Sequence, residues 1–149
     1  MNIPVARNIP VTSYAHRIFP RMERYFKFGF SDKNSKDYPI NLELNETPIG
    51  VYENTPNQIK GSIIITDKGL HYCVEDNSSK TVYYGDIEEG NISEDKLTVT
   101  VLDIYLKDGS VFYLPVNRNS KNSRFSDLFE IWHFLNNVTH ELRISKITE

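Results

Sequence analysis

The stretch from Gly61 to Val74 constrains the fold of this chain most strongly, because its residues are those of a β-hairpin. Three β-branched isoleucines, Ile63 to Ile65, lead into a polar turn at residues 66–69, where an aspartate can bond its own backbone and a glycine can take a positive φ. In the apolar run that follows, His71 and Cys73 alternate with apolar residues. This alternation predicts a second strand with one buried face and one partly wet face.

Further strand signals arrive from residue 49 onward at the short, regular spacing that is typical of an antiparallel sheet or barrel. Residues 75–80 predict a turn, and residues 107–110, Lys-Asp-Gly-Ser, predict a two-residue hairpin loop. Pro115 has no N–H group for a ladder, so it belongs at a strand end or edge. The predicted strands are Ile49–Glu53, Ile59–Thr66, Leu70–Val74, Thr81–Tyr84, Leu97–Leu106 and Val111–Val116.

The strand predicted over Leu97–Leu106 changes phase along its length. Apolar residues occupy alternate positions up to Val101 and shift to the opposite parity from Leu102 onward. A β-bulge near Leu102 or Asp103 would restore one continuous buried face, and bulges of this kind bend a sheet toward a barrel. A strand that is covered on both faces is the alternative interpretation.

An amphipathic helix is predicted near the C-terminal end, from about Arg124 to Leu142, with Ser123 as its N-cap. Asp127 and Glu130 would lie near the positive end of its dipole. A helix with this much apolar surface must bury it, and an open sheet needs a cover, so the two are expected to pack together. The apolar positions are Phe125, Leu128, Phe129, Trp132, Leu135, Val138 and Leu142, widened by Ile131 and Phe134.

A shorter helix is predicted near the N-terminus. The amphipathic pattern runs from Tyr14 to Phe28, but a proline inside a helix costs about 3 kcal/mol. The helix is therefore expected to start at Pro20 and to end near residue 29. The arginines of the amphipathic pattern have two interpretations, a solvated face of a packed helix or a basic face that touches an anionic membrane or nucleic acid. These arginines are Arg17, Arg21 and Arg24.

Composition limits the class of protein. At 149 residues the chain suits one domain, and its 39% hydrophobic and 25% charged residues are ordinary for a globular protein. The single cysteine excludes an intramolecular disulfide, and neither a signal peptide nor a run of about 20 apolar residues is recognisable. With a net charge of -3, a nucleic-acid partner is not expected. We expect a cytoplasmic protein, with peripheral attachment to a membrane as an option.

No catalytic, cofactor or metal motif stands out in the sequence. Glu130 and His133 have the spacing found in carboxylate-bridged metal sites, but such sites need a second motif, so the pair is interpreted as a solvent-side helical pair. Cys73 has no basic neighbour in sequence and is interpreted as a packing residue instead of a nucleophile. We therefore expect a non-catalytic protein without a cofactor or a metal.

The segment over residues 117–124, just before the C-terminal helix, is the best local candidate for a binding site. Unpaired backbone N–H groups and the helix dipole favour anions at a helix N-terminus, and this segment adds three cations and two hydroxyls. A phosphate or an acidic loop of a partner could dock there, and a solvated connector is the alternative. The candidate residues are Arg118, Ser120, Lys121, Ser123 and Arg124.

Three pieces of the sequence carry a family resemblance. They are the hairpin over Gly61–Leu70, the Tyr-Gly-Asp-Ile step at residues 84–87, and the turn at residues 107–110 before the last strand and helix. In this order, residues 48–142 resemble the pleckstrin-homology-like superfold in its GRAM and bacterial variants. The resemblance implies a mainly β fold, a bent antiparallel barrel capped by the C-terminal helix, over a domain of residues 48–149. It also implies a seventh strand, which would lie in residues 86–93 or 40–44. Residues 1–47 would be an N-terminal extension with one short helix, packed on the domain or partly disordered.

Two functions follow from this reading. The first is protein binding by an adaptor or immunity-type protein, through sheet edges, the acidic loop at residues 86–95 or the aromatic N-terminal region. The second is peripheral binding of anionic lipid headgroups. The family's phosphoinositide binders place several Lys and Arg residues around the first hairpin, whereas residues 54–60 offer only Lys60. An enzyme is the third reading, because pleckstrin-homology-like bodies rarely host catalysis.

Overall fold

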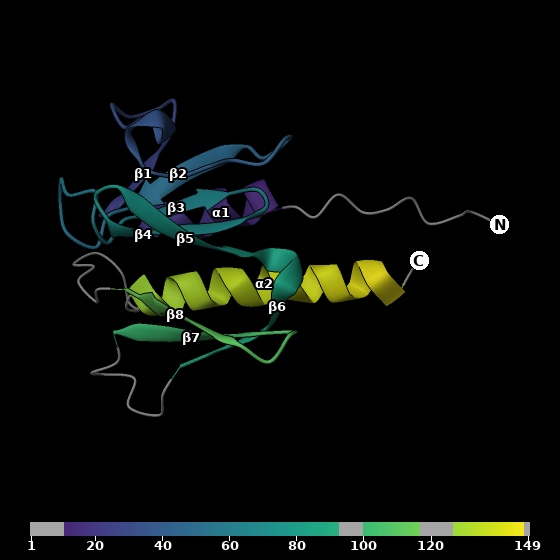
Figure 1. Cartoon of the computed structure of the whole chain (residues 1–149). Coiled ribbons are helices and arrows are strands. Elements are labelled where there is room, and N and C mark those ends of the chain that lie inside the picture. The colour runs from purple at the N-terminus through teal and green to yellow at the C-terminus, as the bar shows by residue number, and fades with distance from the viewer. Residues whose placement is uncertain (1–10, 93–99, 117–126, 148–149) are drawn as a thin grey trace.

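A computed structural model of the chain describes residues 11–92, 100–116 and 127–147, the last five of them as backbone alone (Figure 1). Within these ranges the chain forms two antiparallel sheets, two α-helices and three short 3-10 helices. The elements in chain order are α1 (Val11–Ile18), η1 (Phe19–Arg21), β1 (Tyr25–Lys27), η2 (Ser35–Asp37), β2 (Pro48–Tyr52), β3 (Ile63–Thr66), β4 (Gly69–Glu75), β5 (Ser78–Tyr83), η3 (Tyr84–Asp86), β6 (Ile87–Asn91), β7 (Val101–Leu106), β8 (Val111–Pro115) and α2 (Asp127–Ile147).

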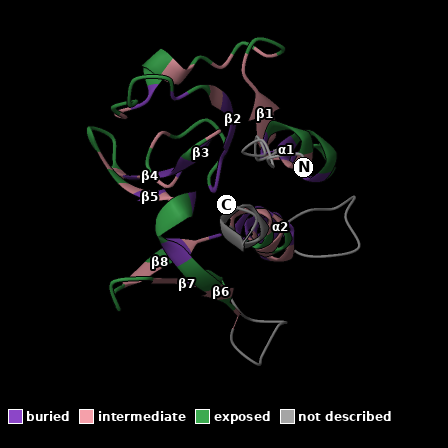
Figure 2. Ribbon diagram, turned by 90° about the vertical axis from the view of Figure 1, so that its right-hand side faces the viewer, coloured by how far each residue is buried: buried purple, intermediate pink, exposed green. Residues whose placement is uncertain are grey.

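Two sheets and one long helix make up the body of the protein. β1 to β5 form a five-stranded sheet in sequential order, and β6 to β8 form a three-stranded sheet in the same manner. η3 connects the sheets, and α2 lies in the space between them with α1 alongside (Figures 1 and 2). The prediction of a mainly β fold with a C-terminal helix and a short N-terminal helix is confirmed. Among the described residues, no strand pairing joins the two sheets.

The predicted central hairpin is confirmed as β3 and β4. The strands are antiparallel, with Ile63 opposite Tyr72. The hydroxyl of Thr66 closes the turn by accepting a hydrogen bond from the Gly69 N–H at 3.0 Å. Glycine is required at position 69 for space and not for a positive φ, because a Cβ atom there would lie 2.4 Å from the Val82 carbonyl oxygen on β5.

β3 is buried on both faces, which explains its run of three isoleucines. Ile64 packs with Cys73 in a small cluster on the outer face of the five-stranded sheet, whereas the isoleucines on either side face the main core. Tyr38 and its neighbours in sequence cover this outer face. β4 does have a partly exposed face, but it is the one with Tyr72 and Val74, so the prediction that His71 and Cys73 lie on the wetter face is wrong. His71 and Cys73 are fully buried because their cover comes from a segment that is distant in sequence.

The main core forms where α2 meets both sheets and α1. Phe134 lies within it, fully buried, with its ring centroid 4.6 Å from that of Phe19 and 5.7 Å from that of Tyr84. α2 continues to Ile147, beyond its predicted end, and no helix within the described residues is long and apolar enough to cross a bilayer. The α2 side chains in this core are Leu128, Ile131, Phe134, Leu135 and Val138.

The N-terminal region differs from the prediction of a helix over residues 20–29. The helix lies earlier, over Val11–Ile18, and Pro20 occupies the 3-10 turn that follows it. Tyr25–Lys27 is a strand paired with β2, with Phe26 opposite Val51. The prediction is wrong because the proline ends a helix here instead of starting one, and because aromatic residues with an available strand partner favour a sheet over the local amphipathic pattern.

With β6, the described residues contain seven strands from Pro48 onward. β6 lies in residues 86–93, one of the two segments in which a further strand was expected, while residues 40–44 form no strand. Ile87 is the apolar residue of this strand, and it alone among the five is buried. An edge strand needs few apolar residues, which explains why its strand signal in the sequence is weak.

β7 has no bulge at Leu102 or Asp103, so that prediction is wrong. The strand pairs with β8 in unbroken register from Val101 to Tyr105. The irregularity lies in the opposite neighbour, β6, where the register with β7 shifts. The apolar residues change parity between Val101 and Leu102, which is the N-terminal end of β7 and not a bulge within it.

The turns of both sheets are close to those predicted, with differences in length. The turn predicted over residues 75–80 is shorter, because β5 already begins at Ser78. The β7–β8 hairpin is confirmed, but its loop spans residues 107–110 instead of two residues. Gly109 in this loop has a φ of +90°, which glycine adopts without strain. Pro115 is the last residue of the edge strand β8, as predicted.

Candidate functional site

The predicted anion site before α2 lies outside the described residues. This holds for all of its candidates, Arg118, Ser120, Lys121, Ser123 and Arg124. That site therefore stays a prediction. The described part of α2 begins at Asp127, whose side chain is buried in protein.

The three arginines that were expected to share a basic face make separate contacts. The Arg17 guanidinium lies 5.0 Å from the centroid of a tyrosine ring on its own helix. Arg21 Nη1 lies 3.6 Å from Glu130 Oε2 on α2. Arg24 Nη1 donates a hydrogen bond to the Asn54 carbonyl oxygen at 2.7 Å. Arg21 and Arg24 thus contact protein groups from two different parts of the fold.

Two carboxylates in the first turn of α2 are buried. The Tyr52 hydroxyl donates to Asp127 Oδ2 at 2.6 Å, and Glu130 lies beside Arg21. The prediction that Glu130 lies on the solvent side is wrong, because α2 packs against η1 and leaves this residue only 3% exposed. Burial raises the pKa of Asp127, and the hydrogen bond from Tyr52 and the charge of Arg24 counteract this rise only in part.

Asp127→Asn is expected to leave the protein as stable as the wild type at pH 7, or more stable. A raised pKa means that ionisation of Asp127 opposes folding. The carboxyl stabilises the fold most at pH values below its usual pKa of 3.8, and this contribution is lost as the pH rises through the raised pKa. Asparagine keeps an acceptor for Tyr52 without the charge. Urea unfolding from about pH 3.5 to about pH 8 should show that the benefit of the variant grows with pH.

Asp127→Ala is the matched control, because it removes the acceptor together with the charge. We expect this variant to lose about 1–3 kcal/mol in the free energy of unfolding. Equal destabilisation of the Asn and Ala variants at pH 7 would contradict the raised pKa of Asp127.

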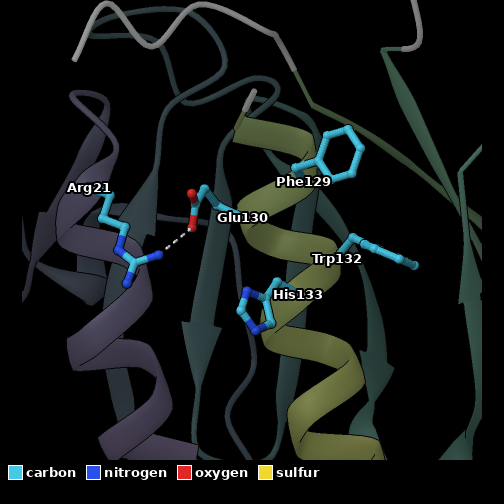
Figure 3. A pocket seen from close by; sticks show the side chains of 5 residues that line it. All are labelled: Arg21, Phe129, Glu130, Trp132 and His133. Carbon is cyan, nitrogen blue, oxygen red and sulfur yellow. Dashed lines mark ion pairs between the residues drawn. The ribbon is translucent and has the colours of Figure 1, made fainter. Parts of the chain in front are cut away.

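A hollow of about 380 Å³ lies between η1 and α2 (Figure 3). Arg21 reaches across from η1 toward Glu130, and Phe129, Trp132 and His133 project from α2. The Phe129 and Trp132 rings meet edge to face, with their centroids 5.9 Å apart. Aromatic walls with a few charged groups at the rim are typical of pockets that take an apolar group.

A second hollow, of about 440 Å³, lies between α2 and the edge strand β6. Trp132 lines it as well as the first hollow, so the two are neighbours, and we call them together the α2 groove. The second hollow differs from the first in chemistry, because polar and acidic residues form its walls. On β6 these are Glu88, Glu89 and Asn91, and on α2 they are Asn136, Thr139 and His140.

Trp132 divides the α2 groove, and β6 fixes its orientation. The indole Nε1 donates a hydrogen bond to the Gly90 carbonyl oxygen at 3.0 Å. A Cβ atom on Gly90 would lie 3.4 Å from Trp132 Cδ1, an ordinary van der Waals contact, so the ring packs directly on the strand at this position. The contact also covers part of the β6 edge, which would otherwise present its backbone groups to solvent.

A buried pair of Glu46 and His71 fixes the C-terminal end of the segment that contains Tyr38 and covers the outer face of the five-stranded sheet. His71 Nε2 lies 2.6 Å from Glu46 Oε2, and His71 Nδ1 lies 2.7 Å from Thr81 Oγ1. Burial would raise the pKa of Glu46, but hydrogen bonds from His71, from the Thr66 hydroxyl and from the Glu43 backbone N–H outweigh this effect and lower the pKa. Both side chains of the His–Glu pair are fully buried, so the pair anchors this segment to β4.

Cys73 lies away from the α2 groove, in the cluster on the outer face of the five-stranded sheet. Burial raises the pKa of its thiol to about 11, so little thiolate forms at neutral pH. Its prediction as a packing residue is confirmed. Among the residues that the structure describes, no three His, Cys, Asp or Glu side chains are grouped so that they could hold a metal ion.

Sequence reasoning does not find the α2 groove. The spacing of three and four places Phe129 and Trp132 in the buried stripe of the helix, whereas both are half-buried in the structure. The sequence contains one indication of the groove: the apolar stripe predicted for the C-terminal helix is wider than one packed helix face requires. The contribution of β6 to the groove could not be predicted, because residues 86–93 and 40–44 were two alternatives for the same strand.

Comparisons of the chain with protein-family models, with curated proteins and with solved structures each found no match. The functional inference therefore rests on the residues of this chain alone.

Proposed function

We propose that this protein is a non-catalytic binding module that recognises another protein through the α2 groove, as an adaptor or immunity-type protein does. The hollow between η1 and α2 carries the proposal. There Phe129 and Trp132 are half-buried, and Arg21 and Glu130 line the same hollow from the side of η1. Tryptophan and arginine are enriched at the centres of protein interfaces, where a side chain of the partner fills a pocket. A bulky apolar side chain suits a hollow of this size and lining.

Fixed contacts at both ends of the first hollow support this reading. The indole N–H of Trp132 is bound to β6, and Arg21 pairs with Glu130 at the other end of the first hollow. Aromatic side chains that are already held in place lose little conformational freedom when a partner binds. The groove therefore resembles a preorganised interface more closely than a random patch of exposed apolar surface.

The order of elements supports a pleckstrin-homology-like assignment for residues 48–142. Seven antiparallel strands, β2 to β8, are followed by one helix, and the first four pair in one sheet and the last three in the other. The resemblance in the sequence implies this order of bent sheets and closing helix. α1 packs on α2, and β1 extends the first sheet. A fold of this type does not specify a ligand, so the ligand class is argued from the α2 groove.

Affinity capture from the cells that make this protein tests the proposal. The tagged wild-type protein is expected to recover one partner in stoichiometric amount. Trp132→Ala should weaken the purified complex by about thirtyfold in Kd, the effect of losing an interface residue worth about 2 kcal/mol. Phe30→Ala is the matched control, because Phe30 is also aromatic, is 80% exposed and lies outside the groove lining.

The proposal is contradicted if no stoichiometric partner is recovered, or if the Kd is the same for wild type and Trp132→Ala. Thermal unfolding of each variant separates a lost contact from a lost fold. Sedimentation with vesicles that contain anionic lipid tests the alternative. Vesicle binding that weakens with salt and persists in Trp132→Ala would favour a lipid-binding function instead.

A further inference from the structure

The first hollow of the α2 groove carries an inference that rests on the proposed function. We infer that this hollow receives an aromatic side chain of the partner protein and selects it over an aliphatic side chain of similar size. The partner therefore presents a phenylalanine, tyrosine or tryptophan at the centre of its docking surface.

Phe129 and Trp132 form the aromatic end of the hollow. Their rings meet edge to face with centroids 5.9 Å apart, and both side chains are half-buried. The hydrogen bond from the indole N–H to the Gly90 carbonyl oxygen fixes the orientation of Trp132 before a partner arrives. Aromatic rings attract one another in edge-to-face and offset geometries, and an aliphatic group lacks this attraction. A third ring in the hollow can extend the existing pair.

Arg21 and Glu130 form the charged end of the hollow. Arg21 Nη1 lies 3.6 Å from Glu130 Oε2, and the side chains are 56% and 3% exposed, respectively. A buried carboxylate thus orients a guanidinium that stays open to solvent and lines the hollow (Figure 3). A guanidinium over the face of an aromatic ring gains a cation–π interaction. A ring that lies on Phe129 and Trp132 at one end can make this contact with Arg21 at the other.

The charge balance of the hollow favours a neutral ring over a charged side chain. Arg21 attracts an acidic group, but the adjacent Glu130 repels it, and a basic group meets the reverse arrangement. A neutral aromatic ring gains the cation–π contact without losing the hydration of a full charge. Of the other described lining residues, only His133 can ionise, and it is exposed.

Cations elsewhere in this chain make the contact that we assign to Arg21. The Arg17 guanidinium lies 5.0 Å from the centroid of the Tyr14 ring, and Lys33 Nζ lies 5.1 Å from that of Phe26. Both pairs lie outside the lining of the hollow. Arg17 therefore supplies a matched control for Arg21, because it is also an arginine of the N-terminal region.

The indole N–H resonance of Trp132 tests the inference, because the chain contains no other tryptophan. The probes are N-acetyl-phenylalanine amide and N-acetyl-cyclohexylalanine amide, whose side chains are similar in size and differ in aromaticity. Titration of each probe into the ¹⁵N-labelled full-length chain gives a Kd from the saturation of the shift. The phenylalanine probe is expected to bind roughly fivefold more tightly than the cyclohexylalanine probe.

Arg21→Gln should weaken the binding of the phenylalanine probe by roughly threefold, because only the aromatic probe gains from the cation. The Kd of the cyclohexylalanine probe should stay unchanged. Arg17→Gln removes the same charge outside the hollow and should leave both Kd values unchanged. Arg21→Gln removes the cation next to the buried Glu130, so Arg21→Gln/Glu130→Gln, which removes both charges, should show the same loss even if the single variant is unstable.

Three results would overturn the inference. They are equal Kd values for the two probes in the wild type, parallel losses of both probes in the Arg21 variants, and the absence of a saturable shift with the phenylalanine probe. Thermal unfolding of each variant confirms that the fold is retained.

The purified partner separates this inference from the proposed function. A Kd that increases with Trp132→Ala but not with Arg21→Gln overturns the inference and leaves the proposed function standing. Increases with both variants, and none with Arg17→Gln, support both. An increase with Arg17→Gln as large as with Arg21→Gln would show a general charge effect and overturn the inference. An unchanged Kd with Trp132→Ala contradicts the proposed function, whatever the probes do.

Discussion

Glu46→Ala should lower the free energy of unfolding by about 1–3 kcal/mol at pH 7 for each buried group that loses its partner, and the first of these groups is the imidazole of His71. His71 and Glu46 are both fully buried, at 2.6 Å from each other. The same substitution removes the acceptor of the Thr66 hydroxyl. Since Glu46 connects the covering segment to β4, loss of its carboxylate should loosen that cover. Urea unfolding measures the effect.

The effect of Glu46→Ala should depend on pH. The lowered pKa of Glu46 means that its stabilising contribution is complete above its usual value of 4.5 and is lost as the pH falls through the lowered pKa. The difference between wild type and variant should therefore narrow below pH 4.5. Glu75→Ala is the control, since its pair with Lys60 is exposed and worth less than about 1 kcal/mol. A loss for Glu46→Ala as small as for Glu75→Ala would contradict the anchoring role.

Phe134→Ala should cost about 3–5 kcal/mol, the range for removing a fully buried phenylalanine ring. The ring lies between Phe19, which follows α1, and Tyr84, which connects the two sheets. Its removal leaves a cavity at the place where the N-terminal segment, both sheets and α2 come together. Thermal unfolding should show a decrease in Tm of roughly 6–20 °C for a chain of this length.

His133→Ala provides the control for Phe134→Ala, because it changes the adjacent residue on the exposed side of α2. We expect its free energy of unfolding to stay within about 0.5 kcal/mol of the wild type. If Phe134→Ala were as mild as His133→Ala, α2 could not be the element that packs both sheets.

The sequence predicts those elements whose own pattern decides their structure. The isoleucine run of β3 and the closely spaced turn specify a hairpin that the structure confirms. The long apolar periodicity near the C-terminus likewise specifies α2. In both cases the local preference and the packing of the folded protein agree.

The failures have a common physical cause, which is packing between segments that are distant in sequence. His71 and Cys73 were expected to be half-exposed on a strand, and they are buried because Glu46 contacts His71 and Tyr38 packs in the cluster of Cys73. Tyr25 and Phe26 fit an amphipathic helix as well as a strand, and pairing with β2 decides between the two. No local pattern contains that information.

The α2 groove was beyond prediction for the same reason. It needs η1, α2 and β6 in fixed relative positions, and only the α2 residues were assigned to an element correctly from the sequence. The arginines were recognised as noteworthy, but the partner of Arg21, the buried Glu130, was expected to lie in solvent. Predicting that ion pair would have required the packing of η1 against α2.

The environment of Trp132 in the purified complex tests the central claim most directly. Incorporation of 5-fluorotryptophan places one fluorine in the chain, since position 132 holds its only tryptophan, and leaves the partner unlabelled. If the partner docks in the α2 groove, the ¹⁹F resonance should shift on binding, and its sensitivity to exchange of H₂O for D₂O should disappear. A resonance that stays unchanged, and equally sensitive to D₂O, in the saturated complex would contradict the claim.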